Sequence, residues 1–307
     1  MALSQVKARI NGVEHVLTYN AGTGKYEKTI TAPNVTSYNV NAGHYYPVTV
    51  EATNTAGTVA TVNDVSPTVG PSLRLLVKEK VKPTIAVTSP GAGAYVSNSK
   101  QPIMFQLRDE TNGSGVNLST LALKIDGGTS IGSGAAGMVC TPVTGGYNCT
   151  YTPQTALSDG AHTVTINVSD YDGNSATQAS RSYTVDTAPP ILNVTNPASG
   201  FITNNANLTV QGTTNDVTSS PVTIAIRLNG TDQGPVTVTA GSFAKSIILA
   251  EGANTIVITA TDAANQVTTV TITGTLDTSV PQITAVTITP NPVDAGATMV
   301  ISVSVTG

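Results

Sequence analysis

Asp159-Gly-Ala-His-Thr-Val-Thr-Ile-Asn-Val-Ser-Asp170 decides the fold of this chain, because the same kind of stretch returns 92 residues later. The second copy reads Glu251-Gly-Ala-Asn-Thr-Ile-Val-Ile-Thr-Ala-Thr-Asp262 and aligns with the first without a gap. In both copies apolar and polar residues alternate, which is typical of a strand with one buried and one solvated face. The stretch therefore predicts two copies of one antiparallel β unit.

A second repeated phrase marks where units begin. It reads Pro83-Thr-Ile-Ala-Val-Thr-Ser-Pro90, then Pro190-Ile-Leu-Asn-Val-Thr-Asn-Pro197, then Pro281-Gln-Ile-Thr-Ala-Val-Thr-Ile-Thr-Pro290, with starts 107 and 91 residues apart. Periods of this length are too long for solenoid repeats, so each unit is expected to be a separate sandwich. The boundaries predicted from these joins are 1–82, 83–188, 189–280 and 281–307.

Composition and turn signals indicate an all-β chain. Charged residues make up 10% and aromatic residues 4% of the 307 residues, and Trp is absent. Turn dipeptides such as Asn11-Gly12, Asp126-Gly127 and Asn229-Gly230 separate the alternating runs. About seven short strands per unit, with prolines at the joins, predict tandem immunoglobulin-like β-sandwiches over the first three segments.

The stretches Pro83 to Pro189 and Pro190 to Val280 resemble bacterial immunoglobulin-like repeats. The resemblance rests on the Pro-opened first strand, the Gly-x-(His/Asn)-Thr-(Val/Ile)-x-(Ile/Val) strand and the hairpin from Asp170 to Asn174, which has a counterpart from Asp262 to Gln266. Such repeats occur in surface adhesins, secreted carbohydrate-active enzymes and bacteriophage tail proteins. The resemblance covers roughly two thirds of the chain and implies the fold, but this fold hosts many unrelated functions.

Charge and hydropathy exclude two classes of partner. The net charge is −4 and the pI is near 5.3, so no basic surface is available for phosphate backbones and we expect no nucleic-acid binding. No run reaches the roughly 18–20 apolar residues that span a bilayer, so we expect no membrane insertion. The first ten residues alternate like a strand and lack a signal-peptide pattern. That start favours a mature or recombinant chain, or export within a virus particle.

The two cysteines are predicted to face each other across a hairpin. A two-residue loop at Thr144-Gly145 pairs Val143 with Gly146, and the same register places Cys140 opposite Cys149. Counting outward puts them in a non-hydrogen-bonded pair, where Cα atoms approach to about 4.5 Å. We therefore expect a disulfide, which forms in an oxidising compartment; two free thiols in a cytosolic protein are the alternative.

One local pattern raises the question of calcium. Asp170, Asp172 and Asn174 have the alternate spacing of a calcium loop, and Asp109 with Glu110 could approach from a neighbouring loop. However, when positions are counted from Asp170, the glycine of the loop, Gly173, is fourth instead of sixth. The twelfth position is Arg181, where a calcium loop has a glutamate. The sequence favours a glycine-assisted hairpin over a metal site, and no cofactor is expected.

No catalytic arrangement stands out. His15, His44 and His162 are separated in the sequence, and the second repeat has Asn254 where the first has His162, which favours structural roles. Gly128-Thr-Ser130-Ile-Gly132 has the spelling of a nucleophile elbow, but it lies in a Gly/Ser-rich stretch of a sandwich and not between a strand and a helix. We therefore predict that the chain is not an enzyme.

Two segments are candidates for contacts with other molecules. Half of the ten tyrosines lie in the first 82 residues, and they either form a docking or glycan-contact surface or fill a core that lacks Trp: Tyr19, Tyr26, Tyr38, Tyr45 and Tyr46. Segment 281–307 has two expected strands, 283–289 and 299–306, which are marginal alone. It is either part of a fourth unit or a strand pair that completes its sheet with another chain.

The sequence leaves two classes of function open. The main prediction is a structural and adhesive component of a phage tail or related particle, located in the virion. Its modules would act as rigid spacers and present a contact surface that docks onto other particle proteins or binds host glycans. The alternative is a stalk fragment of a bacterial cell-surface adhesin, or an accessory region of a secreted carbohydrate-active enzyme. Homo-oligomers or strand exchange through 281–307 would fit either.

Overall fold

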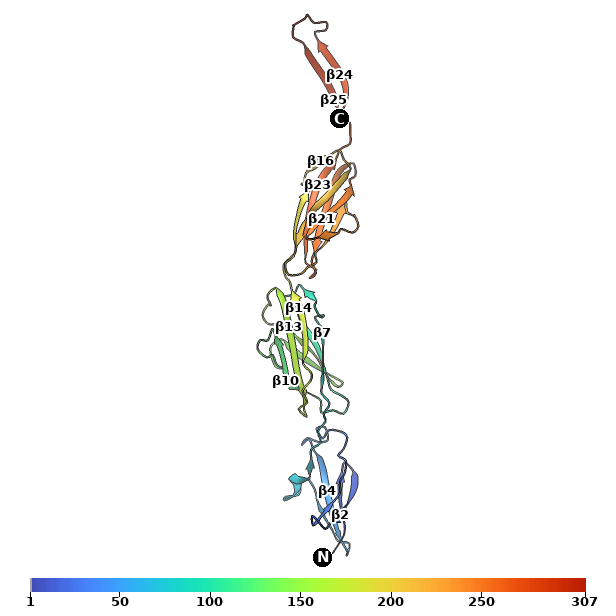
Figure 1. Cartoon of the computed structure of the whole chain (residues 1–307), viewed down its shortest axis with the longest axis vertical. Coiled ribbons are helices and arrows are strands. Elements are labelled where there is room, and N and C mark those ends of the chain that lie inside the picture. Colours follow the sequence, from blue (N-terminus) through green and yellow to red (C-terminus); the bar gives the residue numbers. More distant parts are fainter. Residues whose placement is uncertain (1) are drawn as a thin grey trace. The chain divides into compact units, whose positions relative to one another are not determined.

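The computed structural model describes residues 2–307 and is built almost wholly from β-strands (Figure 1). Its contacts divide the chain into two compact units, Met1–Ala94 with Ser99–Thr184 and Tyr95–Asn98 with Val185–Gly307. The described part contains no helix that is both long enough and apolar enough to cross a bilayer. The all-β prediction is confirmed.

The N-terminal segment forms one sheet in the order β3-β2-β1-β4-β5, with β6 also pairing with β4. This differs from the sandwich predicted for 1–82, because its strands do not supply a second apolar layer. Among residues 2–82, which the structure describes, only Val6, Ala8 and Tyr46 are buried hydrophobic residues, while Val13 and Val16 on β2 remain exposed. The elements are β1 (Leu3–Ile10), β2 (Val13–Asn20), β3 (Lys25–Glu27), β4 (Tyr46–Asn54), β5 (Val59–Val62), the 3₁₀ helix η1 (Gly70–Leu73) and β6 (Arg74–Leu75).

The second module is a two-sheet sandwich. One sheet runs in the order β11-β12-β9-β7, and the other contains β10, β13 and β14 in that order. Alternate residues of β13 are buried, and Val164, Ile166 and Val168 face the core. The strands are β7 (Thr84–Ser89), β8 (Tyr95–Val96), β9 (Ile103–Arg108), β10 (Val116–Ile125), β11 (Met138–Val143), β12 (Gly146–Tyr151), β13 (Gly160–Asp170) and β14 (Ala179–Val185).

The third module repeats this architecture with sheets β15-β17-β21-β20 and β16-β23-β22-β18-β19. Ile256, Ile258 and Ala260 on β22 are fully buried, in the places that the sequence repeat assigns to the core. The strands are β15 (Ile191–Asn196), β16 (Phe201–Thr203), β17 (Asn207–Asn215), β18 (Thr223–Leu228), β19 (Thr231–Asp232), β20 (Val238–Thr239), β21 (Ser242–Ile248), β22 (Gly252–Thr261) and β23 (Val267–Leu276).

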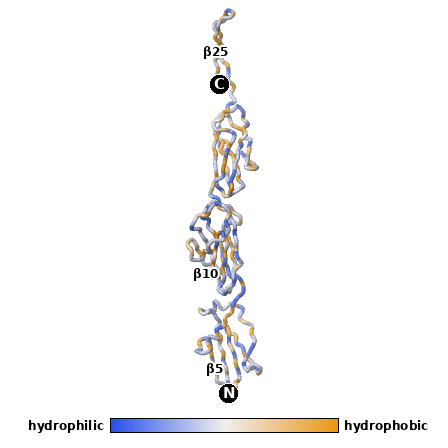
Figure 2. The backbone as a smooth tube through the Cα atoms, turned by 60° about the vertical axis from the view of Figure 1, so that its left-hand side comes forward, coloured by the Kyte–Doolittle hydropathy of each residue, from blue (hydrophilic) through white to orange (hydrophobic). Residues whose placement is uncertain are grey.

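The two sandwiches follow one plan of pairing. The Pro-opened phrase forms the first strand of each, and that strand pairs antiparallel with the second long strand: β7 with β9 and β15 with β17. The repeated stretch forms β13 and β22, where buried residues alternate with more exposed ones as expected for a sheet with one buried face. Hydrophobic and hydrophilic residues are interspersed along the whole backbone (Figure 2). Residues that the sequence repeat aligns therefore occupy equivalent strand positions in the two sandwiches.

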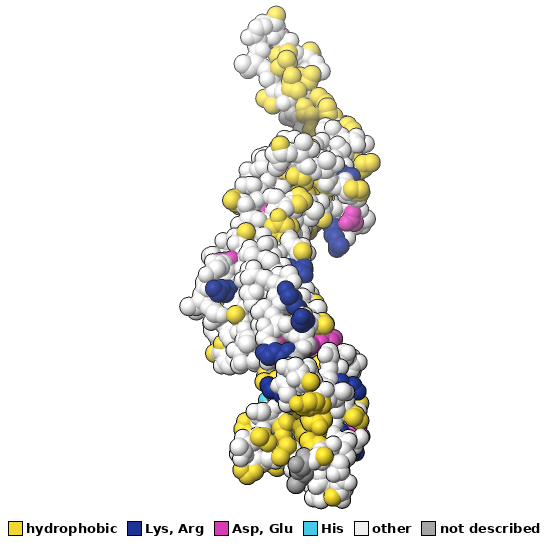
Figure 3. All heavy atoms as spheres, turned by 60° about the horizontal axis from the view of Figure 1, so that its bottom comes forward, with side chains coloured by type: hydrophobic (Ala, Val, Ile, Leu, Met, Phe, Trp, Pro, Cys, Tyr) yellow, Lys and Arg dark blue, Asp and Glu magenta, His cyan; other side chains and the backbone are white. Residues whose placement is uncertain are grey.

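The C-terminal segment is a two-stranded hairpin of β24 (Gln282–Thr289) and β25 (Val300–Thr306). The third copy of the Pro-opened phrase in the chain forms β24. This strand pairs antiparallel with the next strand, as the first strand of each sandwich does. Ile283 lies opposite Val305 and Ile288 opposite Ile301, and all four side chains are exposed. Hydrophobic side chains therefore gather on the surface of the hairpin, at the top of Figure 3 (Figure 3).

Candidate functional site

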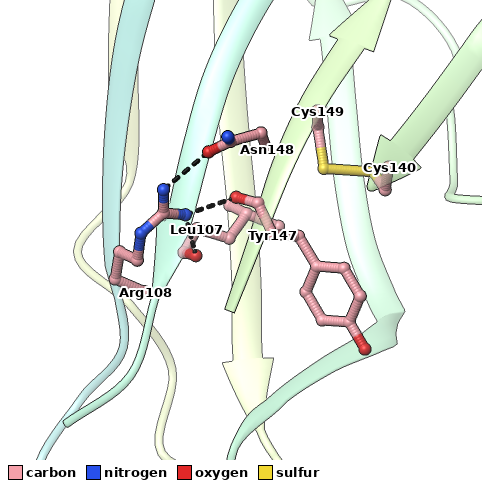
Figure 4. Close-up of a disulfide and its surroundings, with 6 residues drawn as sticks. All are labelled: Leu107, Arg108, Cys140, Tyr147, Asn148 and Cys149. Atoms are coloured by element: carbon pink, nitrogen blue, oxygen red, sulfur yellow. Dashed lines mark hydrogen bonds between the residues drawn. A yellow bond between two sulfur atoms is a disulfide. The ribbon is translucent and has the colours of Figure 1, made fainter. Parts of the chain in front are cut away.

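The cysteine hairpin is the first of the sequence-selected sites. Cys140 on β11 lies opposite Cys149 on β12, with Cα atoms 4.1 Å apart, and the two form a disulfide. Arg108 reaches over the same hairpin and donates hydrogen bonds to the Tyr147 carbonyl (2.6 Å) and to Asn148 Oδ1 (2.6 Å) (Figure 4). Cys149 is buried and Cys140 is half-buried, so the disulfide joins β12 to β11 on one face of the sheet. The arrangement is a structural clamp on the edge of one sheet.

His162 holds a turn of its own sandwich. Its Nε2 lies 2.8 Å from the Ser158 carbonyl and its Nδ1 lies 2.7 Å from Asp126 Oδ2. Burial opposes the charged ring, but these two hydrogen bonds and the Asp126 charge outweigh it and raise the pKa of His162. In the third module the same place is taken by neutral groups, with Asn229 Nδ2 donating to Asn254 Oδ1. The two modules therefore carry a titratable and a non-titratable form of one turn clamp.

The five N-terminal tyrosines do not form one surface. Tyr46 is buried and its hydroxyl donates to the Val35 carbonyl, so it belongs to the core. Tyr45 donates to Asp64 Oδ2 at 2.8 Å. The other three lie elsewhere: Tyr19 and Tyr26 form a ring pair on β2 and β3, and Tyr38 stacks between His44 and Tyr171. The structure thus gives them separate roles, and only Tyr19 is largely exposed.

A groove of about 330 Å³ opens on the N-terminal sheet. Ile10, Val13, His15, Ile30 and Pro33 line it, and none of the five tyrosines does. His15 is the only titratable residue in this lining, so the groove offers apolar contact and no paired acid and base. Ser130 lies beside Ile131, which forms a β-bridge with Leu123, and therefore does not occupy a strand-to-helix elbow.

Three carboxylates from distant segments meet in the second module. Glu79 precedes β7, Asp109 follows β9 directly and Asp170 ends β13; one oxygen of each lies within 4.8 Å of the others. The Gly115 N–H donates to Asp109 Oδ2 at 2.7 Å, while Asp109 Oδ1 and Glu79 Oε2 are buried without a hydrogen-bond partner. Burial raises the pKa of Asp109, the Gly115 N–H partly offsets this, and the neighbouring carboxylates, including Asp172, raise it further.

The third module has the matching cluster of Asp186, Asp216 and Asp262, whose oxygens also lie within 4.8 Å of one another. Asp186 is fully buried and accepts a hydrogen bond from the hydroxyl of Ser219, which is fully buried as well. Asp216 Oδ1 accepts the N–H groups of Thr218 (2.8 Å) and Ser219 (2.7 Å). Backbone donors thus hold the carboxylates in fixed orientations.

The local calcium spacing seen in the sequence is not the arrangement that the fold assembles. Both oxygens of Asp170 accept hydrogen bonds from Asn174, at 2.8 and 2.7 Å, and Asp172 Oδ2 accepts from Thr36 Oγ1 and the Glu79 N–H. Asp170 and Asn174 therefore close the hairpin by hydrogen bonds to each other, whereas Asp172 accepts hydrogen bonds from two residues outside the hairpin. Sequence reasoning missed Glu79 as a member of the cluster, although an acid stands five residues before the first strand in both sandwiches.

Family comparisons agree with the two sandwiches. Residues 97–187 match the family described as "Bacterial Ig-like domain", and residues 190–278 match the family described as "Glucodextranase, domain B". The chain therefore contains modules of these two kinds in tandem. No curated protein matches the chain in sequence. Neither family is described as a phage tail protein.

Solved structures that match the chain come from several settings. The fibronectin(III)-like modules of Clostridium thermocellum CbhA are 17% identical, with coverage of 62% of this chain and 93% of theirs and a TM-score of 0.40. A 1.5-MDa bacterial ice-binding adhesin is 20% identical, with coverages of 90% and 88% and a TM-score of 0.33. SGBP-B of Bacteroides ovatus, solved with a mixed-linkage heptasaccharide, is 15% identical, with coverages of 92% and 62% and a TM-score of 0.23.

Proposed function

We propose that these tandem bacterial Ig-like modules serve outside the cell as a non-catalytic region, either the stalk of a surface adhesin or the accessory part of a secreted carbohydrate-active enzyme. The observation that supports this most directly is the pair of family matches on adjacent sandwiches, 97–187 and 190–278. One family is bacterial and Ig-like, and the other is a domain of a glucodextranase. We propose glycans and other surface proteins as the binding partners of this region.

The side chains with catalytic potential have structural partners instead. His162 is held by Asp126 and the Ser158 carbonyl, and His44 Nδ1 lies 2.5 Å from the Tyr38 carbonyl. We infer that modules of this kind contribute spacing and contact area, because no serine hydroxyl of the described residues is hydrogen-bonded to a histidine ring, and the Ser219 hydroxyl that donates to Asp186 is fully buried. The Cys140–Cys149 disulfide fits an oxidising location, where such bonds form and persist.

Surface labelling tests the location. Intact cells of the native source are treated with a membrane-impermeant biotinylation reagent, and the labelled fraction is probed for peptides of residues 83–280. We expect labelling to match that of a known surface protein and to exceed that of a cytosolic protein. Peptides labelled only after cell lysis would contradict the proposal. The phage-tail reading stays a prediction, and recovery of the chain in sedimenting particles would favour it.

Glycan contact is tested on the intact chain by affinity electrophoresis in gels that contain soluble α-glucans or β-glucans. A retarded band supports an accessory role toward that polymer, and Tyr19→Ala tests the exposed tyrosine of the N-terminal sheet. Tyr38→Ala is the control, because that ring is already stacked between two others. Hydrolysis of the polymer by the purified chain would overturn the non-catalytic part of the proposal.

A further inference from the structure

The N-terminal sheet reproduces one sheet of the third module strand by strand. Residues Gln5–Gly12 align without a gap with Thr223–Gly230, and both stretches end in an Asn-Gly pair with positive φ. β1 pairs with β4 in the register in which β18 pairs with β22, and β4 pairs with β5 in the register in which β22 pairs with β23. The N-terminal module thus has the counterparts of β18, β22 and β23.

The segment that contains β3 corresponds to one strand of the opposite sheet. Residues Gly24–Ile30 align without a gap with Gly241–Ile247, which include most of β21. In the third module β17 pairs along β21, and β15 pairs with β17. Within residues 2–82 no strand takes the places of β15 and β17, and β3 lies at the edge of its sheet. The N-terminal module is therefore a sandwich without its first two strands.

The face that those two strands cover in the third module is partly open in the N-terminal module. Ile258 is fully buried, whereas its counterpart Val50 is half-buried. Ile247 is 3% exposed, whereas its counterpart Ile30 is 36% exposed and lines the groove on the N-terminal sheet. Hydrophobic side chains gather on the surface of this module, at the bottom of Figure 3. An apolar surface therefore remains where the third module has its core.

The C-terminal hairpin holds the two strands that the N-terminal module lacks. β24 and β25 pair as β15 and β17 do 91 residues earlier, with a bulge in the first strand of each pair. Every second residue of β17 is buried toward its C-terminal end. The counterparts of these buried residues in β25 are apolar and at least half exposed: Ile301, Val303 and Val305. The hairpin therefore presents the side chains of a core that its own residues do not complete.

We propose that the C-terminal hairpin of one copy of the chain completes the N-terminal sandwich of another copy. The apolar face of the hairpin covers the apolar face of β1 and β4, and β25 adds to the open edge of the segment that contains β3. This is the interface that β15 and β17 make inside the third module, where strand pairing adds backbone hydrogen bonds to apolar contact. β24 and β25 carry no charged residue, so the contact buries no unpaired charge on the hairpin side.

The size of the contact and its polarity determine the kind of assembly. A contact made by two strands belongs to the small interfaces, below about 1,200 Å² in total, so we expect association in the micromolar range. The hairpin and the sheet are different surfaces, so the contact is head-to-tail and each added copy leaves one of each surface free. Copies then form rings or open chains.

The equivalence of strands also gives the register of the contact. In the third module Thr213 of β17 lies opposite Ser242 of β21. Their counterparts are Ser304 in the hairpin and Lys25 in the N-terminal module, and both are exposed. Ser304 of one copy should therefore lie opposite Lys25 of the next copy.

Cross-linking tests this register. Chains with Lys25→Cys are mixed with chains with Ser304→Cys and treated with a short bismaleimide, which does not react with the Cys140–Cys149 disulfide. We expect a product of twice the 31.2 kDa mass of the chain. Thr61→Cys is the matched control, because Thr61 is exposed on β5 at the other edge of the same sheet and should give no product with Ser304→Cys.

Sedimentation velocity of the full chain at rising concentration measures the association. The mass should rise above 31.2 kDa, and Val303→Asp on the apolar face of the hairpin should abolish the rise. Thr287→Asp is the control, because Thr287 lies between Val286 and Ile288 on the opposite face of the hairpin. Ile30→Asp should abolish the rise from the acceptor side.

Mixing the two inactive variants tests the head-to-tail arrangement. The Val303→Asp chain retains an intact sheet, and the Ile30→Asp chain retains an intact hairpin. We expect the mixture to form a one-to-one complex and nothing larger, although neither variant associates alone.

Three results would overturn the proposal. The first is a chain that stays monomeric as its concentration rises. The second is a mixture of Val303→Asp and Ile30→Asp chains that forms no complex, since a contact between two hairpins would behave in this way. The third is a chain with both Lys25→Cys and Ser304→Cys that cross-links within itself while the mixed single variants do not, which would show closure within one copy.

Discussion

Removal of the disulfide should destabilise the second module alone. The bond joins residues nine apart in sequence, and the chain-entropy relation for a closed loop of that length gives about 2.6 kcal/mol. The pairing of β12 with both β11 and β9 is retained without it, so the module should still fold. For a domain of this size the loss corresponds to a fall in Tm of about 10–20 °C.

Differential scanning calorimetry of the full chain resolves this effect if the modules unfold in separate transitions. The chain is scanned with and without reductant, beside a Cys140→Ala/Cys149→Ala variant under the same conditions. One transition should fall on reduction of the unsubstituted chain, and reductant should not change the variant. A Tm that is the same in both redox states would refute the reasoning, as would an equal fall in every transition.

Three further predictions concern single side chains. Because folding raises the pKa of His162, the contribution of this residue to stability is fully present below the unfolded pKa of about 6.5 and is lost as pH rises through the folded pKa. Urea unfolding should therefore show a lower unfolding free energy at pH 8 than at pH 6, and His162→Asn should abolish this pH dependence. A Cβ on Gly212 would lie 2.3 Å from a backbone oxygen, so Gly212→Ala should cost about 1–3 kcal/mol in unfolding free energy, whereas Gly134→Ala, with open space, should not. Burial raises the pKa of Tyr183 to about 12 and leaves its hydroxyl without a hydrogen-bond partner, so Tyr183→Phe should keep or raise the unfolding free energy. Tyr46→Phe removes a hydrogen bond and should lower the unfolding free energy by about 0.5–1.5 kcal/mol. Chemical denaturation of the two variants measures both changes.

Features that depend on local spacing could be predicted from the sequence. Alternation along β13 and β22 identified the buried residues, because side chains of a strand point to opposite faces. The two-residue loop at Thr144-Gly145 determined the register that brings Cys140 to Cys149, because an antiparallel hairpin has a single register once its loop is known. Both inferences need only neighbours along the chain.

Features that depend on distant segments could not be predicted. Asp186, Asp216 and Asp262 are 30 and 46 residues apart in succession, and only the pairing of the module's strands brings them together. The N-terminal segment has enough alternation to indicate strands, but alternation does not tell whether they close into two sheets or remain in one. Tyr46 illustrates the same limit, because an aromatic ring suits a core as well as a docking surface.

The most direct test of the central claim is to locate the chain in its native source. Cytosol, envelope, medium and sedimenting particles are separated on a density gradient, and non-reduced peptides of each fraction are measured by mass spectrometry. The account predicts that the chain lies in the envelope or the medium, with the peptides of Cys140 and Cys149 linked. A chain found in the cytosol with free thiols, or one that sediments with phage particles, would contradict it.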